Sequence, residues 1–288
     1  MAMVGARLGA AAVLAVSALG GAAVWAASGE HVHIERQKWS FGGFTGKFDE
    51  AQLQRGFRVY TEACARCHSI KRIAFRNLVQ PGGPQFPEAG VKSLAAKYEV
   101  DAEPNDQGKV LKRPAILVDT IPPPYKNEQE ARSALNGAYP PDLSLIARAR
   151  GIETNAPFYM VPVNMARDIV SAYQEAGSDY VYAYLTGYED APKGTKLPDG
   201  MNYNKAFPSP HFTAMPNPFA GGEGLVKYDD GTPETVDNYA RDVTAFLSWA
   251  GDPRLEDRKW IGLMVMGYLL ITAILMFFAY KRTWKGAH

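Results

Sequence analysis

Two cysteines and a histidine form the most chemically specific group in the sequence. Cys64, Cys67 and His68 follow the pattern C-x-x-C-H, which attaches a c-type haem through two thioether bonds. The histidine beside the second cysteine can offer an imidazole nitrogen to the iron. If this segment is helical, the three side chains project from one face of the helix. The spacing therefore predicts one covalently bound haem c, His68 as an axial ligand, and an electron carrier.

The rest of the cysteine and histidine content favours haem over its alternatives. Both cysteines of the 288-residue chain lie in this motif, so none is left for a structural disulfide elsewhere. A zinc or thiol redox site would need further ligands at paired spacing, or a thioredoxin-like context. The other histidines are scattered, namely His31, His33, His211 and His288. Chance occurrence of the motif is the other alternative, because a motif match is a hypothesis.

The second axial ligand of the iron must come from another part of the chain. The methionines outside the terminal apolar segments are Met160, Met165, Met201 and Met215. Met215 lies between prolines in the sequence A-M-P-N-P, which deny it a helix and hold a stiff loop. Met160 and Met165 fall in or near an amphipathic helix, where methionine more often fills a core. Local pattern alone leaves the choice among these methionines, or a histidine, open.

The N-terminus has the pattern of a secretory signal peptide over residues 1–28. A single basic residue, Arg7, precedes an uncharged stretch from Leu8 to Val24, and small residues follow. An uncleaved N-terminal anchor is the alternative, because the basic region is weak. Both interpretations predict that the following domain is exported.

The C-terminus contains a predicted transmembrane helix at 260–280. Residues 261–280 carry no charge, and at about 1.5 Å per residue they span the hydrocarbon core of a bilayer. Three basic residues stand on each side of the segment, so the positive-inside rule does not decide its orientation. The exported haem domain does: residues 29–259 are expected in the periplasm and the tail 281–288 in the cytoplasm. This predicts a single-pass protein of the inner membrane.

The middle of the chain predicts one mainly α-helical haem domain with long loops. Twenty prolines and 27 glycines, many in clusters such as Pro122–Pro124, separate the helices. No segment has a clear strand pattern. Helices are expected over 49–67, 91–98, 128–137, 144–150, 163–177, 179–187 and 235–250.

Several longer motifs resemble the cytochrome c1 family, the haem subunit of the ubiquinol–cytochrome c oxidoreductase (cytochrome bc1 complex), in its bacterial form. The resemblance extends over most of the predicted domain, in order and spacing. Its parts are Arg55–Tyr60 before the haem motif, Asn136–Ser144 with Arg148–Arg150, Asp179–Val181 with Leu185–Tyr188, Met215-Pro216, and Tyr228–Pro233. The resemblance implies that Met215 is the distal ligand of the iron.

The resemblance also implies a haem pocket. Its contacts with the haem or its propionates would come from Tyr60, Asn136, Pro141, Arg150 and Tyr180. Arg150 has the clearest physical basis, because a guanidinium can pair with a propionate through two hydrogen bonds. Pro141 would wall the haem edge. Tyrosines at helical spacing are, as an alternative, ordinary core residues.

The function implied by the resemblance is transfer of one electron from the Rieske iron–sulfur protein to a soluble or membrane-anchored cytochrome c. Partners would include the cytochrome b subunit, where quinol is oxidised, and dimerisation would occur through the complex. No catalytic residue is expected on this subunit, and nucleic acid is not expected among its partners. A stand-alone membrane-anchored cytochrome that serves an oxidase is the alternative, and a haem-based sensor a third possibility.

Two further features concern the surface of the domain. Residues 151–178 form an insertion longer than in mitochondrial relatives, and packing of Phe158, Tyr159, Met160, Val163 and Met165 is expected to hold it. Without Arg7 and the three basic residues of the tail, 27 basic residues face 30 acidic ones, a net charge of −3. An acidic cluster at 99–106 could steer a basic cytochrome c, or could be an ordinary solvated loop.

Overall fold

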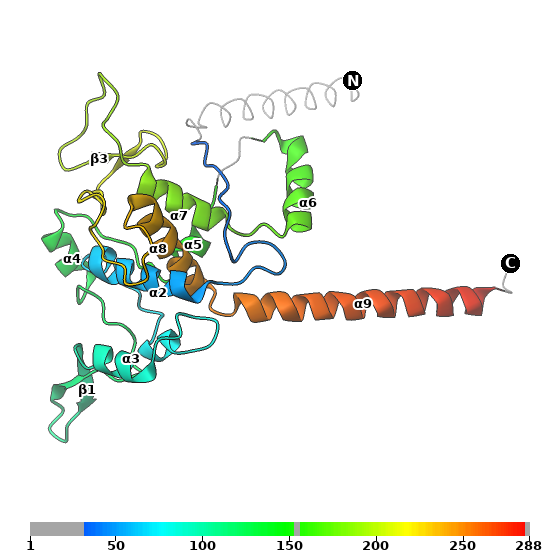
Figure 1. The fold of residues 1–288 in the computed structure, drawn as a ribbon, viewed down its shortest axis with the longest axis horizontal. Helices are drawn as coiled ribbons and strands as arrows, with labels where there is room; N and C mark the ends of the chain where they lie inside the picture. The colour runs from blue at the N-terminus through cyan, green and yellow to red at the C-terminus, as the bar shows by residue number, and fades with distance from the viewer. Residues whose placement is uncertain (1–31, 153–155, 286–288) are drawn as a thin grey trace, which may run out of the picture.

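A mostly helical domain carries one long helix that leaves it (Figure 1). The computed structural model describes residues 32–152 and 156–285, so the predicted signal peptide at 1–28 lies outside the described residues. The mainly α-helical fold with long loops and an apolar C-terminal helix is confirmed. In chain order the elements are α2 (Glu50–Val59), η1 (Tyr60–Cys64), η2 (Phe75–Leu78), α3 (Glu88–Ala95), β1 (Glu99–Pro104), β2 (Val110–Pro114), α4 (Glu128–Ala134), α5 (Ile146–Ala149), η3 (Phe158–Met160), α6 (Val161–Ser171), α7 (Ala176–Thr186), β3 (Asn202–Tyr203), β4 (Phe212–Thr213), α8 (Val236–Gly251) and α9 (Leu255–Trp284).

Helices α2 and α8 pack against each other at the centre of the domain. The side chains of Asp49 and Thr235 cap their first turns by accepting backbone N–H groups. Gly56 lets the two helices approach closely, because a Cβ there would lie 2.7 Å from the Cβ of Phe246. Phe57 packs edge-on against Phe246, with ring centroids 5.5 Å apart. This contact fixes the helix that leads into the C-x-x-C-H motif.

Helix α8 is the core of the domain, buried on nearly every side from Tyr239 to Ala250. Helices α5 and α7 pack on it beside α2. A buried carboxylate, Asp242, is neutralised by Arg55, whose Nε donates to it at 2.8 Å. Burying an ion pair costs little free energy only when the remaining hydrogen-bonding groups of both partners are also bonded. Arg55 meets this condition in part by pairing with Asp230 as well. The predicted helix 235–250 is therefore correct, and it is the central element of the fold.

Two short strand pairs were not predicted from the sequence. Strands β1 and β2 form an antiparallel hairpin in which Asp101 lies opposite Lys112 and pairs with it. Strands β3 and β4 pair over two residues each. Strand β1 alternates acidic residues with the half-buried Val100 and Ala102, a strand pattern that the sequence prediction missed, whereas β2 is mostly exposed and has no such alternation. The acidic cluster at 99–106 lies on this hairpin, with basic residues on the neighbouring strand.

The insertion folds differently from the prediction. Its helix α6 ends at Ser171 rather than at 177, since Ala172 takes a left-handed conformation with φ of 50°. The expected packing of its apolar residues is wrong. Their side chains are exposed, with fractions of 84% for Phe158, 65% for Tyr159, 37% for Met160, 56% for Val163 and 60% for Met165.

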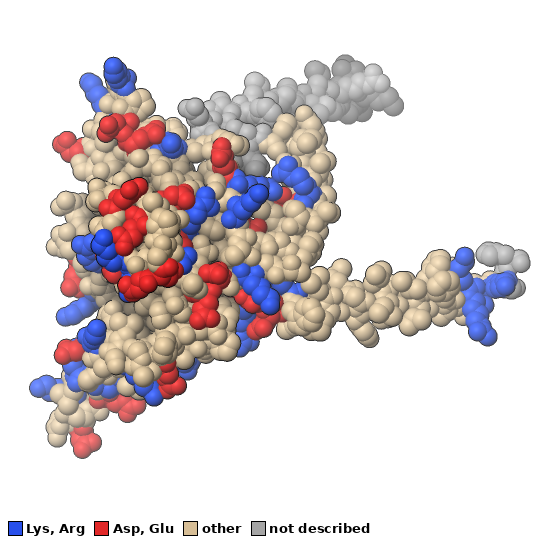
Figure 2. Space-filling view, viewed as in Figure 1, with Lys and Arg blue, Asp and Glu red and all other residues tan. Residues whose placement is uncertain are grey.

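Helix α9 contains the predicted span 260–280 and extends it at both ends. Among the described residues it is the one helix long and apolar enough to cross a membrane. Figure 2 shows the helix uncharged along most of its length, between charged residues near the domain and a basic group at the far end. Such a helix is consistent with a single-pass membrane anchor.

Candidate haem-binding site

Cys64, Cys67 and His68 lie on a tight turn rather than on a continuous helix. Helix α2 passes into one wider π turn, η1, which a backbone hydrogen bond of 2.8 Å to the Tyr60 carbonyl closes. The N–H groups of Cys67 and His68 then both return to the Cys64 carbonyl, at 3.1 and 2.9 Å. The predicted helix 49–67 is therefore wrong in its last part. Single π turns are frequent at functional sites because they redirect the side chains that follow.

The His68 ring is held in one protonation state by the carbonyl of Pro141. Nδ1 lies 2.9 Å from that oxygen, and a carbonyl only accepts, so Nδ1 carries the proton and Nε2 keeps its lone pair. Burial lowers the pKa of His68 against the opposing effects of Pro141 and Asp142. Burial therefore favours the neutral imidazole, the form that ligates a metal. The Tyr60 hydroxyl donates to the His68 carbonyl at 3.2 Å and fixes the backbone of the same residue.

Asp142 ties the Pro141 segment to the haem motif, a role that the sequence did not reveal. Its carboxylate accepts the Ser69 hydroxyl at 2.7 Å and the backbone N–H groups of Lys71 and Ser144, each at 2.9 Å. The bonds from Ser69 and Lys71 span 73 and 71 positions of the chain. They hold the Pro141 carbonyl within reach of His68. An aspartate two residues before a serine is a turn signal, but nothing in that pattern names the partner loop.

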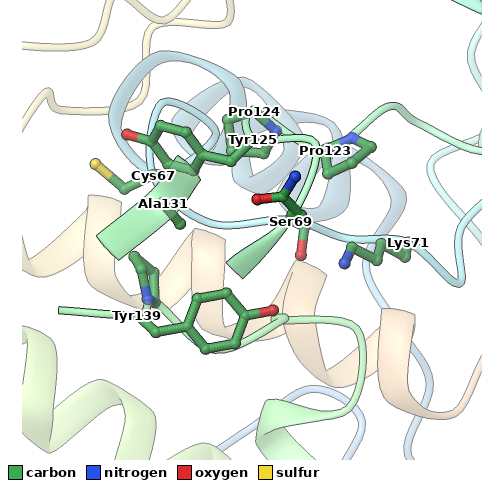
Figure 3. A pocket seen from close by; sticks show the side chains of 10 residues that line it. Cys67, Ser69, Lys71, Pro123, Pro124, Tyr125, Ala131 and Tyr139 are labelled. Carbon is green, nitrogen blue, oxygen red and sulfur yellow. The ribbon is translucent and has the colours of Figure 1, made fainter. Parts of the chain in front are cut away.

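The two thiols lie in different environments, and only that of Cys67 borders a hollow. Cys64 is 6% exposed, and burial raises the pKa of its thiol to about 12. Cys67 is half-buried and lines the hollow. Figure 3 shows Tyr125 and Tyr139 on opposite sides of this space, with Cys67 and Lys71 towards its two ends. Neither cysteine forms a disulfide, so both thiols are available for another bond.

Two hydrogen bonds hold the backbone of Met215 in place. The Tyr188 hydroxyl donates to its carbonyl at 3.1 Å, and its own N–H donates to the Thr213 hydroxyl at 3.3 Å. The side chain is half-buried and packs against the core cluster that contains Cys64. Tyr188 and Thr213 are positioning residues that the sequence did not single out.

Arg150, at the end of α5, lies near enough to Tyr180 of α7 for its charge to act on the tyrosine hydroxyl. The charge of Arg150 opposes the effect of burial, which raises the pKa of Tyr180. Tyr180 stacks on Tyr184, and Tyr184 meets Tyr188 edge-on. This row of tyrosines connects Tyr180 with the loop of Met215. Arg150 itself is exposed at the end of α5.

The last predicted pocket residue, Asn136, lies at an exposed turn after α4. It has a φ of 51°, in the left-handed region that asparagine tolerates, and Gly137 follows with a φ of 88°. No side-chain hydrogen bond of Asn136 occurs among the described residues. Its position in the structure is that of a helix terminator, and a haem contact stays a prediction.

Comparison with known proteins identifies the family. The model of the Cytochrome C1 family matches residues 39–287. The chain belongs to the cytochrome c1 family. A protein named cytochrome b/c1 from Bradyrhizobium diazoefficiens is 46% identical over 252 residues, which are 87% of this chain and 35% of that protein. Cytochrome c1 of Blastochloris viridis is 45% identical over 85% of this chain and 84% of its own length. The mitochondrial cytochrome c1 heme protein of Saccharomyces cerevisiae is 39% identical over 89% of this chain and 74% of its own length.

Membership of the cytochrome c1 family confirms the predicted class of function. This is a haem-binding family of electron-transfer subunits in the respiratory chain. The site fits such a group on its own chemistry: two free thiols flank one turn, and no hydrogen bond within 32–152 and 156–285 uses Nε2 of the imidazole beside them. The relative from Bradyrhizobium carries cytochrome b in its name, and the chain spans about a third of its length.

Replacing Asp142 with asparagine tests how the chain holds His68. Burial alone would raise the pKa of Asp142, but its bonds from Lys71, Ser144 and Ser69 lower it below the ordinary value. A carboxyl whose pKa is lowered on folding stabilises the protein at pH values above its unfolded pKa of about 3.9. This stabilisation is lost as the pH falls through the pKa of the folded state. We expect a loss of about 1 kcal/mol at pH 7, after discounting charge-assisted hydrogen bonds for partial exposure.

The measurement is thermal unfolding of the full chain at pH 7 and below pH 4. The difference in unfolding temperature between wild type and Asp142→Asn should be smaller at the lower pH. Asp106→Asn is the matched control, since Asp106 is exposed on the β1–β2 hairpin and should leave stability unchanged. A gap that stays constant with pH would contradict the role given to the Asp142 charge.

Proposed function

We propose that the chain carries one haem c, bound covalently through Cys64 and Cys67, as the electron-transfer subunit of a cytochrome bc1 complex. His68 would bind the iron through Nε2, and Met215 would be the second axial ligand. The observation that carries the proposal is the 2.9 Å bond between His68 Nδ1 and the Pro141 carbonyl, which leaves the lone pair of the neutral ring on Nε2. When bound, the haem iron supplies one-electron chemistry by changing between the ferric and ferrous states.

The surrounding residues would orient the haem and hold its charge. Arg150 is exposed, and none of the ion pairs found within 32–152 and 156–285 uses its guanidinium. It is free to pair with a propionate through two hydrogen bonds, and Tyr180 beside it could donate a third. The Tyr60 hydroxyl donates to the His68 carbonyl, so Tyr60 would also hold the ligand in place, and its contact with the haem stays a prediction.

We place the haem domain, 29–259, on the periplasmic side of the inner membrane, after removal of a signal peptide at 1–28. The span 260–280 would anchor it, with the tail 281–288 in the cytoplasm. The Rieske iron–sulfur protein would donate the electron, and a soluble or membrane-anchored cytochrome c would accept it. The name cytochrome b/c1 of the Bradyrhizobium relative supports a cytochrome b partner, and the dimer would follow from the complex. That name favours the complex over a stand-alone cytochrome.

The experiment that tests the proposal replaces Met215 with leucine. We expect loss of the weak near-infrared band that reports methionine bound to ferric haem iron. The midpoint potential should fall by a sizeable fraction of the roughly 0.8 V over which axial ligands set haem potentials, because the thioether raises the potential. The near-infrared band and the midpoint potential are both measured during a redox titration of the purified full chain, followed by absorption spectroscopy.

Met165→Leu is the matched control for this experiment. Met165 is 60% exposed on α6, so its replacement should change neither the band nor the potential. If the band survives in Met215→Leu, the ligand is another methionine, such as Met160 or Met201, and the proposed ligand pair is wrong.

A further inference from the structure

The segment from Phe158 to Ser171 exposes an apolar surface that no other described element covers. Phe158 is 84% exposed, Ile169 69% and Val170 76%. Within the described parts of the chain, α6 packs appreciably only against its own leading turn, η3. Single exposed apolar residues need no explanation, but a contiguous apolar face marks an interaction site.

Helix α6 separates its polar and apolar residues cleanly. The polar side chains recur at helical spacing and fall on one narrow side, namely Asn164, Arg167, Asp168 and Ser171. The apolar side chains occupy the rest of the circumference, namely Val161, Pro162, Val163, Met165, Ala166, Ile169 and Val170. This is the pattern of a helix that lies at a boundary between water and an apolar phase.

The contacts of α6 hold its polar side against the domain. Asp168 pairs with Arg36 at 2.9 Å, and the Arg36 guanidinium stacks over Tyr173 at 3.7 Å from the ring centroid. Gln174, which follows α6, accepts a hydrogen bond of 3.0 Å from Arg258 in the first turn of α9. The apolar side of α6 therefore faces outward, and its C-terminal end is tied to the beginning of the membrane helix.

The position of α6 relative to α9 gives the direction of that outward face. In Figure 1 α9 runs along the horizontal axis, and α6 stands across this direction, level with the first turns of α9. These turns contain Trp260 and the start of the uncharged run at Ile261. In Figure 2 the outer edge of the domain over α6 is uncharged, and it faces the side from which α9 leaves.

We propose that η3 and α6 lie in the membrane interface, with their apolar side inserted at the boundary between lipid headgroups and acyl chains. The inference rests on α9 spanning the bilayer, since a span fixes the membrane plane near Trp260. A helix at that level and across the span lies parallel to the bilayer surface. Arg167, whose side chain is 63% exposed, adds a cation that attracts anionic headgroups, and Phe158 and Tyr159 add an aromatic anchor at one end. The domain would thus be held to the membrane at two points, which restricts its rotation about α9.

The test places the photo-crosslinker p-benzoylphenylalanine at Ile169 in the full chain. The protein is reconstituted in nanodiscs of phosphatidylcholine and phosphatidylglycerol, irradiated, and analysed by mass spectrometry for lipid adducts. Leu269, inside the span, is the positive control, and Val110, 49% exposed on the β1–β2 hairpin, is the negative control. We expect lipid adducts at Ile169 in a yield close to that at Leu269 and about tenfold above that at Val110.

Other outcomes separate this inference from the membrane anchor itself. Lipid adducts at Leu269 but none at Ile169 would overturn the interfacial position of α6 and leave the anchor intact. An adduct from Ile169 to another part of this chain, to a second copy, or to another subunit in native membranes would assign the apolar face to protein and also overturn it. Absence of lipid adducts at Leu269 would remove the span on which the inference rests.

Discussion

A chain with serine at both Cys64 and Cys67 is expected to retain no haem after denaturing extraction. The two thiols are the only ones in the sequence, and a hydroxyl cannot replace a thiol in a thioether bond. Without these bonds, the haem is held by axial ligands and packing alone and dissociates when the protein unfolds. The measurement is haem peroxidase staining of the denatured chain on a gel, with the pyridine haemochrome spectrum as a quantitative check.

The single variants refine this result. Cys64→Ser and Cys67→Ser should each keep one thioether bond, so the denatured chain stays stained while the haemochrome maximum moves to longer wavelength. Ala65→Ser is the matched control, because Ala65 lies between the two cysteines and should leave both the stain and the spectrum unchanged. Haem that survives denaturation in the double variant would show that the attachment is not through these cysteines.

The parts of the fold that follow from local pattern were predictable. The helix at 235–250 and the apolar span at 260–280 have long, regular patterns, and both lie where the sequence placed them. The haem motif was equally clear, because its chemistry depends on residue types at fixed spacing. The wide turn at Tyr60–Cys64 was not predictable, since a π turn differs from an α-helix by one residue in hydrogen-bond spacing and leaves the apolar pattern unchanged.

The features that depend on distant contacts were missed. Asp142 and Tyr188 position His68 and Met215 through bonds to parts of the chain far away in sequence, and one sequence does not reveal such pairings. The wrong prediction that the apolar residues of η3 and α6 are packed has a different cause. Amphipathic periodicity was recognised there, but the pattern states only that one face is apolar, not whether protein or another apolar phase covers it.

Replacing Gly56 with alanine should destabilise the domain even though alanine is the better helix former. The new Cβ would overlap the carbonyl oxygen of Asp242 and lie 2.7 Å from the Cβ of Phe246. Neither neighbour can move easily, because both belong to α8, which is buried among α2, α5 and α7. Overpacking of this kind costs about 3 kcal/mol, against a gain of about 1 kcal/mol from helix propensity. We therefore expect a net loss of about 2 kcal/mol, measured by thermal unfolding of the full chain.

Gly90→Ala gives the same chemical change in open space. A Cβ at Gly90, in α3, meets no atom within 4 Å, so only helix propensity acts and stability should rise by up to about 1 kcal/mol. The two substitutions thus differ in sign if the close approach of α2 to α8 is real. Because α2 leads directly into the Cys64 turn, Gly56→Ala should also lower the yield of haem-bearing chain, while Gly90→Ala should not. An increase in stability for both variants would mean that α2 and α8 do not pack at Gly56, and the framework that positions the haem motif would have to be redrawn.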